Sequence, residues 1–304
     1  MENEIKLSPF KPLLTGAIDD FKKRIKTTLA FSGLYIAAGT IFGIIISAAI
    51  IFGIINALVG ITIGVMGGLA LLFASYLIQG AFLYSMKDGA KLKESFSFIW
   101  KNKWSYLWIA ILTFLIVLPG IIALIIPGII ISIFAGFSLF VFMDSGLKGI
   151  SSIRRSIGLV KGHFWPILGR FALFTLVAMA AGIAASIVGG VFNFFLDGLG
   201  GFIENLFNIF IVTPIALCFS WRLFKDIKEK KSDIKESIPQ KDGKLKALAA
   251  IGVIIIVGGT IAVACFWSAI NQWIMENAKE PVPVDNEIDL SEILKEYENL
   301  PVEE

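Results

Sequence analysis

The run "LAFSGLYIAAGTIFGIIISAAIIFGII" (residues 29–55) decides the fold, because it holds 27 residues without a single charged side chain. The hydrocarbon core of a bilayer is about 30 Å thick, and roughly 20 apolar residues of α-helix cross it. Inside lipid every backbone N–H and C=O needs a partner within the protein, which a helix supplies. This run therefore predicts a transmembrane α-helix.

The rest of the chain repeats this pattern. Of 304 residues, 56% are hydrophobic and 17% charged, too few polar side chains to cover a soluble globule of this size. Further apolar runs lie at 61–86, 104–126, 128–143, 164–190, 203–224 and 247–270, with a hinge between the third and fourth spans at Pro127-Gly128. We expect an all-α, polytopic integral membrane protein with a six-span helical core (29–224) and a seventh, C-terminal span (247–270).

In the loops between the spans, Lys and Arg occur only in alternate connections. They precede the first run and fill the segments after the second, fourth and sixth, whereas 56–60, 190–202 and the turn near 127 hold none. Short segments rich in Lys and Arg stay in the cytoplasm. We therefore expect a multi-pass plasma-membrane protein with a cytoplasmic N-terminal segment (1–28), a basic cytoplasmic linker (225–246) and an acidic extracytoplasmic tail (271–304).

The basic segment 148–161 has the spacing of an amphipathic helix. Its apolar side chains recur at helical intervals, and its polar side chains share the opposite face. The apolar residues are Ile150, Ile153, Ile157 and Val160, and the polar residues are Lys148, Ser151, Ser152 and Arg155. This pattern predicts an elbow helix lying on the cytoplasmic membrane surface, with Gly162 ending it in a left-handed cap.

An earlier segment, "DGAKLKESFSFIWKNKWSYLWIAIL" (88–112), has the same order of glycine, amphipathic helix, basic pair, aromatic residue and span. A shift of about 60 residues pairs Ser85 with Ser145, Gly89 with Gly149, Lys101 with Lys161, Trp104 with Phe164 and Phe114 with Phe174. We interpret this as a parallel duplication, with "IDDFKKRIKTTLAF" (18–31) as a third, degraded copy. Coincidence of apolar composition is the alternative.

Basic side chains on such elbows attract anionic lipid headgroups, each contributing about 1 kcal/mol. The candidate headgroup contacts are Lys148, Arg154, Arg155, Lys161, Lys101 and Lys103. Small residues at four-residue steps predict close helix packing, with a groove for a headgroup or substrate as the alternative. These residues are Gly60, Gly64 and Gly68 in the second span, and Gly182, Ser186 and Gly190 in the fifth.

The stretch "PGIIISIFAGFSLFVFMDSGLKGISSIRRSIGLVKGHFWPILG" (127–169) resembles the membrane domain of glycerophosphoryl diester phosphodiesterases and related uncharacterised bacterial inner-membrane families. The matching residues are Pro127, Gly128, Asp144, Gly146, Arg155, Ser156, Lys161, Gly162 and Trp165. The resemblance covers about 10–230 and leaves out the seventh span and the tail. It implies a membrane module, because in those enzymes catalysis belongs to a separate soluble barrel.

Catalytic chemistry has little support in the residues. A metal site needs several imidazole, thiolate or carboxylate ligands, and the chain has one histidine, His163. A Ser/His/Asp triad could be assembled around His163 and Asp144, but no sequence motif around them indicates an activated nucleophile or an oxyanion hole. We expect no enzyme activity, catalytic residue, metal, cofactor or nucleic-acid partner, and we interpret His163 as an interfacial residue.

Three function classes follow. A non-catalytic integral membrane module that contacts lipid, anionic on the cytoplasmic side, or assembles with partners comes first; a transporter of a lipid or other amphiphile is the alternative, and a membrane-embedded enzyme is third. Charged residues well inside the spans are almost absent, which disfavours an ion-coupled pump. The tail 276–304 holds ten acidic residues against Lys279 and Lys295, and it predicts either a helix that docks a protein partner or a solvated segment.

The predicted orientation can be tested with single cysteines at Ser232 in the linker and Asn286 in the tail, in a background lacking Cys218 and Cys265. An impermeant thiol reagent added to intact cells should label only the tail position, because the Lys- and Arg-rich linker stays inside. Labelling of the linker without the tail would reverse the orientation.

Overall fold

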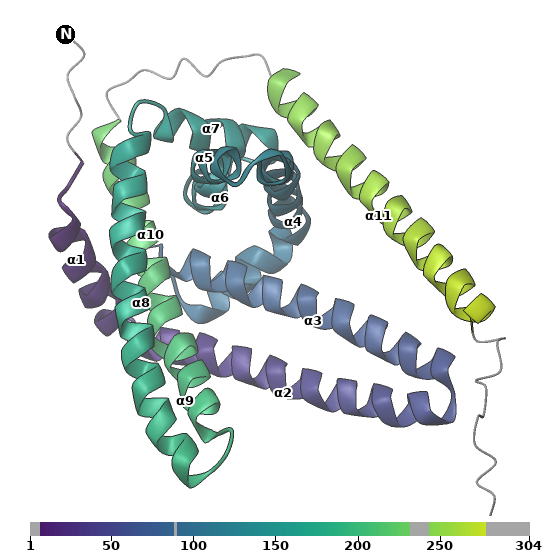
Figure 1. Ribbon diagram of the computed structural model, residues 1–304. Helices are drawn as coiled ribbons and strands as arrows, with labels where there is room; N and C mark the ends of the chain where they lie inside the picture. The colour runs from purple at the N-terminus through teal and green to yellow at the C-terminus, as the bar shows by residue number, and fades with distance from the viewer. Residues whose placement is uncertain (1–6, 88–89, 232–242, 278–304) are drawn as a thin grey trace, which may run out of the picture. The chain divides into compact units, whose positions relative to one another are not determined.

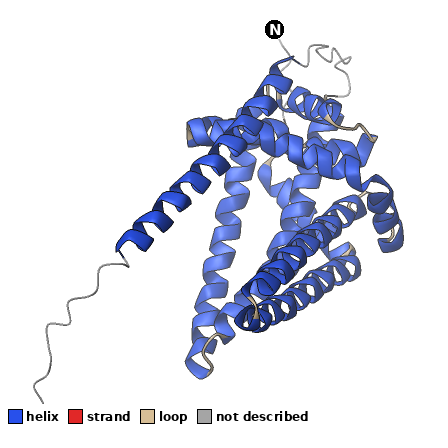
Figure 2. Ribbon diagram, turned by 90° about the vertical axis from the view of Figure 1, so that its right-hand side faces the viewer, coloured by secondary structure: helices blue, strands red, loops and turns tan. Residues whose placement is uncertain are grey.

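The computed structural model describes residues 7–87, 90–231 and 243–277, the side chains of 275–277 excepted. Its helices are α1 (Phe10–Lys23), α2 (Ile25–Ile55), α3 (Ala57–Ser85), α4 (Leu92–Ala123), α5 (Ile125–Gly136), α6 (Ser138–Ser145), α7 (Ile150–Val160), α8 (Phe164–Phe195), α9 (Leu199–Phe207), α10 (Thr213–Lys230) and α11 (Gly243–Asn277), with a π-helical turn η1 (Asn208–Val212) before α10 (Figure 1). Within these ranges there is no strand (Figure 2).

Seven helical stretches in the described ranges are long and apolar enough to cross a membrane. The chain is an all-α polytopic membrane protein, as predicted. Its contacts divide it into two compact parts, Met1–Gly252 and Val253–Glu304. The first part contains six of the spans and the start of α11, and it is the part that builds the site.

Three successive repeats of one elbow helix and one hairpin of spans make up the first part. The first repeat is α1, α2 and α3, and the third is α7, α8 and the α9–α10 stretch. In the second, the elbow is the beginning of α4 (92–101), which a kink at Asn102 separates from the span. The hairpin is then completed by α5 and α6.

The junction between elbow and span has nearly the same backbone conformation in all three repeats. Arg24 has φ −106° and ψ 17°, Asn102 has φ −112° and ψ 16°, and His163 has φ −128° and ψ 18°. Ahead of His163, Gly162 adopts the left-handed conformation expected of it, with φ +86°. The repeat inferred from two segments is therefore present three times in the backbone, and the segment 18–31 holds the first junction.

The positions of the buried residues show how the three repeats align with one another. The residue seven positions before each junction is small and fully buried, and the side chain four positions after each junction is fully buried as well. The first set is Ala17, Ser95 and Ser156, and the second is Thr28, Tyr106 and Ile167. The second and third copies are thus related by 61 residues, one more than the shift that pairs Lys101 with Lys161.

Each elbow packs on the closing span of the repeat before it. The elbow 92–101 packs on α3, where Phe98 stacks on Tyr84 with ring centroids 4.1 Å apart. Helix α7 packs on α5 and α6. Helix α1 packs on α10 of the third repeat (Figure 1). The Phe10 ring there lies edge-on to that of Phe219. The three repeats therefore close into a ring.

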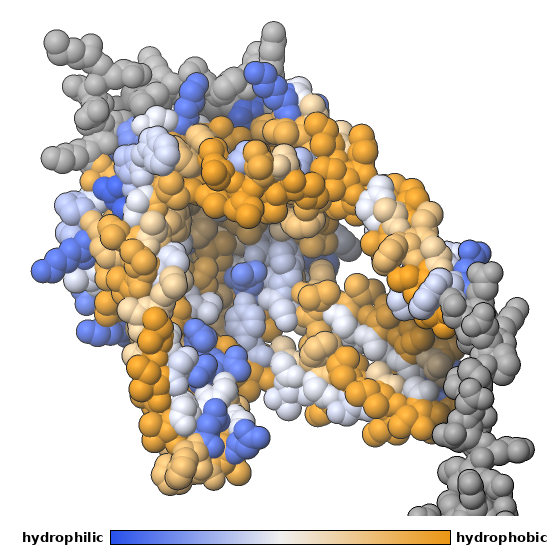
Figure 3. Space-filling model, in the orientation of Figure 1, coloured by the Kyte–Doolittle hydropathy of each residue, from blue (hydrophilic) through white to orange (hydrophobic). Residues whose placement is uncertain are grey.

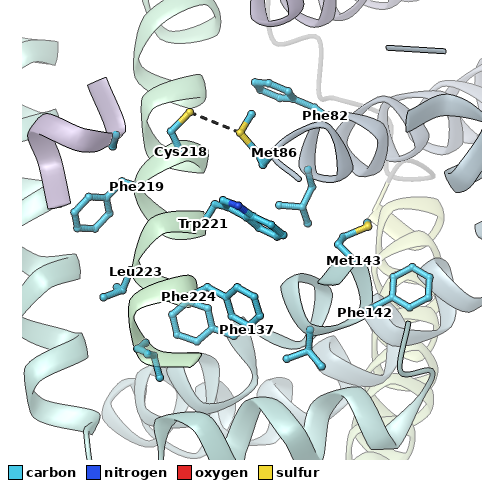
Figure 4. Close-up of a cluster of buried hydrophobic side chains, with 14 of the residues drawn as sticks. Phe82, Met86, Phe137, Phe142, Met143, Cys218, Phe219, Trp221, Leu223 and Phe224 are labelled. Carbon is cyan, nitrogen blue, oxygen red and sulfur yellow. Dashed lines mark hydrogen bonds between the residues drawn. The ribbon is translucent and has the colours of Figure 1, made fainter. Parts of the chain in front are cut away.

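Buried side chains gather at the elbow end of the spans. The main cluster joins the start of α4, the end of α3, α6, α7 and the end of α10, with Phe137, Trp221 and Phe224 among its largest members (Figure 4). In the most apolar stretches of α2 and α8, by contrast, no residue is buried. Apolar side chains cover these helices on the outside (Figure 3), which suits contact with lipid tails.

A pair of glycines brings the two arms of each hairpin together near its tip. The pairs are Gly53 with Gly60, Gly120 with Gly128 and Gly189 with Gly200. A Cβ added to Gly120 would lie 3.1 Å from the Cα of Gly128, and one added to Gly60 or Gly200 would strike the facing backbone. Close approach of helix backbones in lipid depends on such small residues.

Within the described residues, the predicted packing rows make close contacts only in the second span. Gly60 packs closely and Gly64 would place a Cβ 3.6 Å from that of Ala49. Gly68, Gly182 and Gly190 face open space, Ser186 is exposed, and Gly189 makes the contact instead of Gly190. A four-residue step turns about 40° around a helix, so a row of such steps leaves the contact after one or two members.

The predicted hinge at Pro127-Gly128 is displaced by three residues. Leu124 is extended, with φ −167° and ψ 146°, and α5 begins at Ile125. Pro127 is therefore the third residue of α5. The first four N–H groups of a helix have no partner within it, so a proline there loses no hydrogen bond.

Replacing Ser156 by Leu should lower the thermal midpoint of the purified protein. Ser156 is fully buried and its Oγ donates to the Phe134 carbonyl at 2.7 Å, so a larger apolar side chain overfills the contact and orphans that carbonyl. Overpacking costs about 1–3 kcal/mol. Ser151→Leu, one turn away and exposed, is the control. Equal effects of the two changes would contradict the packed elbow.

Candidate functional site

The residues predicted to contact lipid headgroups differ in exposure. Lys101, Lys148 and Lys161 are exposed, whereas Arg154, Arg155 and Lys103 are half-buried. The ammonium of Lys103 lies 4.0 Å from the centroid of the Trp100 ring, a cation–π contact. Of these six side chains, the three exposed lysines therefore present their charges openly at the elbow end.

Helix α7 packs into the ring, and one residue of its predicted polar face is buried there. Ser152, assigned to the polar face, is fully buried and its hydroxyl donates to the Ser138 carbonyl. Helix α6 begins at Ser138 after a break at Phe137, so this hydroxyl binds the first residue of α6. Amphipathic spacing did not reveal this because serine hydroxyls satisfy a neighbouring backbone as readily as water.

Residues of the linker fasten the end of α7. The ammonium of Lys231 donates to the carbonyls of Gly158 and Lys161, at 2.6 Å each, where a helix C-terminus favours a cation. Burial lowers the pKa of Lys231, and the charges of Arg155 and Lys161 lower it further. Nearby, Lys228 forms an ion pair with Asp144, the acidic residue of the 127–169 stretch.

A polar concavity lies at the contact between α1 and α10, and we call it the seam pocket. Its volume is about 350 Å³. Its lining residues are Ser8, Pro12, Leu13, Asp20, Arg24, Met86, Cys218, Trp221, Arg222, Lys225, Asp226 and Glu229. Helix α1 supplies one wall, α10 the opposite wall, and Met86 at the end of α3 part of the floor.

Two polar clusters hold the walls of the seam pocket together. Arg222 donates to both carboxylate oxygens of Asp20, at 2.5 and 3.0 Å. Asp226 accepts from the backbone N–H of Ser8 at 2.9 Å and from its hydroxyl at 2.6 Å. Lys230 lies 3.1 Å from the same carboxylate. Such charged hydrogen bonds are stronger than neutral ones, and the paired geometry fixes α1 on α10.

The segment ahead of α1 is held from the other side by α8. The Arg170 guanidinium donates to the carbonyl of Ser8 at 2.7 and 2.9 Å and to that of Leu7 at 2.9 Å. Arg170 lies two turns into a span, and these contacts place its charge in the seam. A charge at this depth needs such partners.

Trp221 forms the floor of the seam pocket. Only 4% of its surface is exposed, and its Nε1–H has no hydrogen-bond partner among the described residues. Cys218 and Met86 lie beside it, with their sulfur atoms 3.7 Å apart (Figure 4). An indole N–H can only donate, and the described residues supply no acceptor oxygen for it.

Sequence reasoning missed this site because Asp20 and Arg222 are 202 positions apart. The available signal was local: Asp19 and Asp20 interrupt a basic segment, and Arg222, Asp226 and Lys230 alternate in sign at four-residue steps along one helix face. Among the described residues, no group of three His, Cys, Asp or Glu side chains is placed to hold a metal ion. What the seam pocket offers is hydrogen bonding and charge.

Comparisons with protein-family models, curated proteins and solved structures found no match to this chain. The resemblance to phosphodiesterase membrane domains therefore stays a prediction.

The pairing of Asp20 with Arg222 should be measurable as a double-mutant cycle. Asp20→Asn and Arg222→Gln should each lower the thermal midpoint, and the double variant should be no worse than the poorer single variant, because both remove the same contact. The pair is partly exposed, so a coupling of roughly 1 kcal/mol is expected. Asp19→Asn, on the exposed side of α1, is the control. Strictly additive losses would mean that the seam does not depend on this pair.

Proposed function

We propose that this chain is a non-catalytic integral membrane module whose elbow end binds anionic phospholipid. One observation carries the proposal: the elbows pack into the ring with their inner faces and leave Lys101, Lys148 and Lys161 exposed at the ends of the spans. Charges in this position meet the headgroup layer. Because the elbow helices are packed against the spans, they hold these lysines in fixed positions at the ends of the spans.

The membrane and its sides belong to the same proposal. We assign the chain to the plasma membrane with the elbow end in the cytoplasm, because the loops between spans carry their Lys and Arg residues at that end and the cytoplasmic leaflet is anionic. The acidic tail would then lie outside the cell, where it is available to a protein partner. Residues 278–304 of that tail lie outside the described residues.

Transport of a lipid or other amphiphile is the second candidate. One feature favours it: the closing span of the third repeat contains the π-helical turn η1 immediately before Pro214 in α10. Such turns interrupt the helical hydrogen-bond ladder and occur frequently at functional sites. Transfer of labelled lipid between the leaflets of liposomes containing the purified protein would favour this candidate.

The lipid proposal predicts that Lys101→Gln, Lys148→Gln and Lys161→Gln together reduce the retention of anionic phospholipid. Each lysine contributes about 1 kcal/mol near an anionic surface, so retention should fall roughly 100-fold if their effects add. Native mass spectrometry of gently extracted protein reports the bound lipid. The matched control replaces the same lysines by Arg, which keeps the charge.

Unchanged retention in the Gln variant would contradict the proposal. Equal loss in the Gln and Arg variants would also contradict it, because the charge would not then be the cause. We expect both variants to fold, since all three side chains are exposed and the spans insert through their own apolar length.

A further inference from the structure

We propose that the seam pocket binds a zwitterionic group, one that carries an anionic oxygen and an ammonium nitrogen. At about 350 Å³ the pocket is near the lower limit for small-molecule sites. It has room for a phospholipid headgroup or a small free zwitterion, but not for a whole lipid.

The charges of the walls argue for a ligand of both signs. Arg24, Arg222 and Lys225 line the pocket together with Asp20, Asp226 and Glu229. Asp20 pairs with Arg222 and Asp226 with Ser8 and Lys230, so the wall charges balance one another and a ligand of a single sign would upset that balance. A zwitterion can orient so that each of its charges meets the opposite sign, which is how charged sites achieve specificity.

Trp221 supplies a hydrogen-bond donor for the anionic oxygen. Its buried Nε1–H lacks a partner among the described residues, and an unsatisfied donor of this kind costs free energy that a ligand oxygen would recover. Met86 lies beside the indole in Figure 4 and also lines the pocket. Its flexible thioether is the side chain best able to move aside when the ligand enters.

The position of the pocket suits a headgroup. It lies at the elbow end, between α1 and the ends of α3 and α10, the level at which the spans meet the headgroup layer. None of Lys101, Lys148 and Lys161 lines it. The inference is therefore independent of the proposed binding of anionic lipid at those lysines, and either can fail without the other.

The test measures binding of two probes to the full-length protein by native mass spectrometry. The probes are phosphatidylethanolamine and soluble glycerophosphoethanolamine, which share the phosphodiester anion and the ammonium group. The wild-type protein should retain at least one of them, and Trp221→Phe, which deletes the N–H and keeps the aromatic bulk, should weaken that retention roughly tenfold. Trp104→Phe, at an exposed position outside the pocket, should leave it unchanged.

Retention of the lipid assigns the site to a headgroup, and retention of the soluble probe alone assigns it to a free zwitterion. Failure of both probes to bind would overturn the inference. So would wild-type retention in Trp221→Phe together with a higher thermal midpoint, since the indole N–H would then be an unused donor. If Trp221→Phe does not fold, Lys225→Gln decides, with the same tenfold loss expected.

The Lys101, Lys148 and Lys161 variant separates the two proposals. It should retain the zwitterionic probe at the wild-type level, because those side chains lie outside the pocket. Parallel loss of the zwitterionic probe and of anionic phospholipid in that variant would move the zwitterion to the elbow surface and contradict the pocket.

Discussion

The arrangement depends on a small side chain seven positions before each elbow junction. Ala17, Ser95 and Ser156 are fully buried, and they let each elbow lie directly against the closing span of the repeat before it. Lipid tails are as apolar as leucine side chains, so a helix gains little by exchanging lipid contacts for apolar contacts with another helix. Close approach and hydrogen bonds at the elbow end hold the helices together instead, and the lipid-facing parts of α2 and α8 need no protein neighbour.

The ring explains why its polar contacts are concentrated at one seam. Short connections join the first repeat to the second and the second to the third, so those elbows are tethered to the spans on which they pack. The α1–α10 contact joins the two ends of the series without such a connection. It is also where Asp20 pairs with Arg222 and where Asp226 and Arg170 hold the segment ahead of α1. Charged hydrogen bonds take the place of a covalent connection between α1 and α10. The seam pocket lies between these two groups of hydrogen bonds.

Much of this could be predicted from the sequence, because the bilayer fixes the length of a span and small residues mark close packing. The helical class, the seven spans and the elbow at 148–161 follow from such local patterns. The ring contacts do not, since Asp20 and Arg222 are distant in sequence and nothing local pairs them. The contacts of Ser152 and Gly189 were missed because helical spacing predicts which face of a helix is buried only to within about one residue. Which residue makes the contact depends on the position of individual atoms in the packed structure.

Hydrogen–deuterium exchange of the backbone amides, with the protein in lipid nanodiscs, tests most directly whether the ring is closed. Amides in packed elements exchange only when those elements open, whereas a helix resting on the membrane surface frays. The account predicts similarly strong protection in α1, in 92–101 and in α7, because each is an elbow packed on a span. Fast exchange throughout α1, with 92–101 and α7 protected, would contradict it by showing the ring open at the α1–α10 seam.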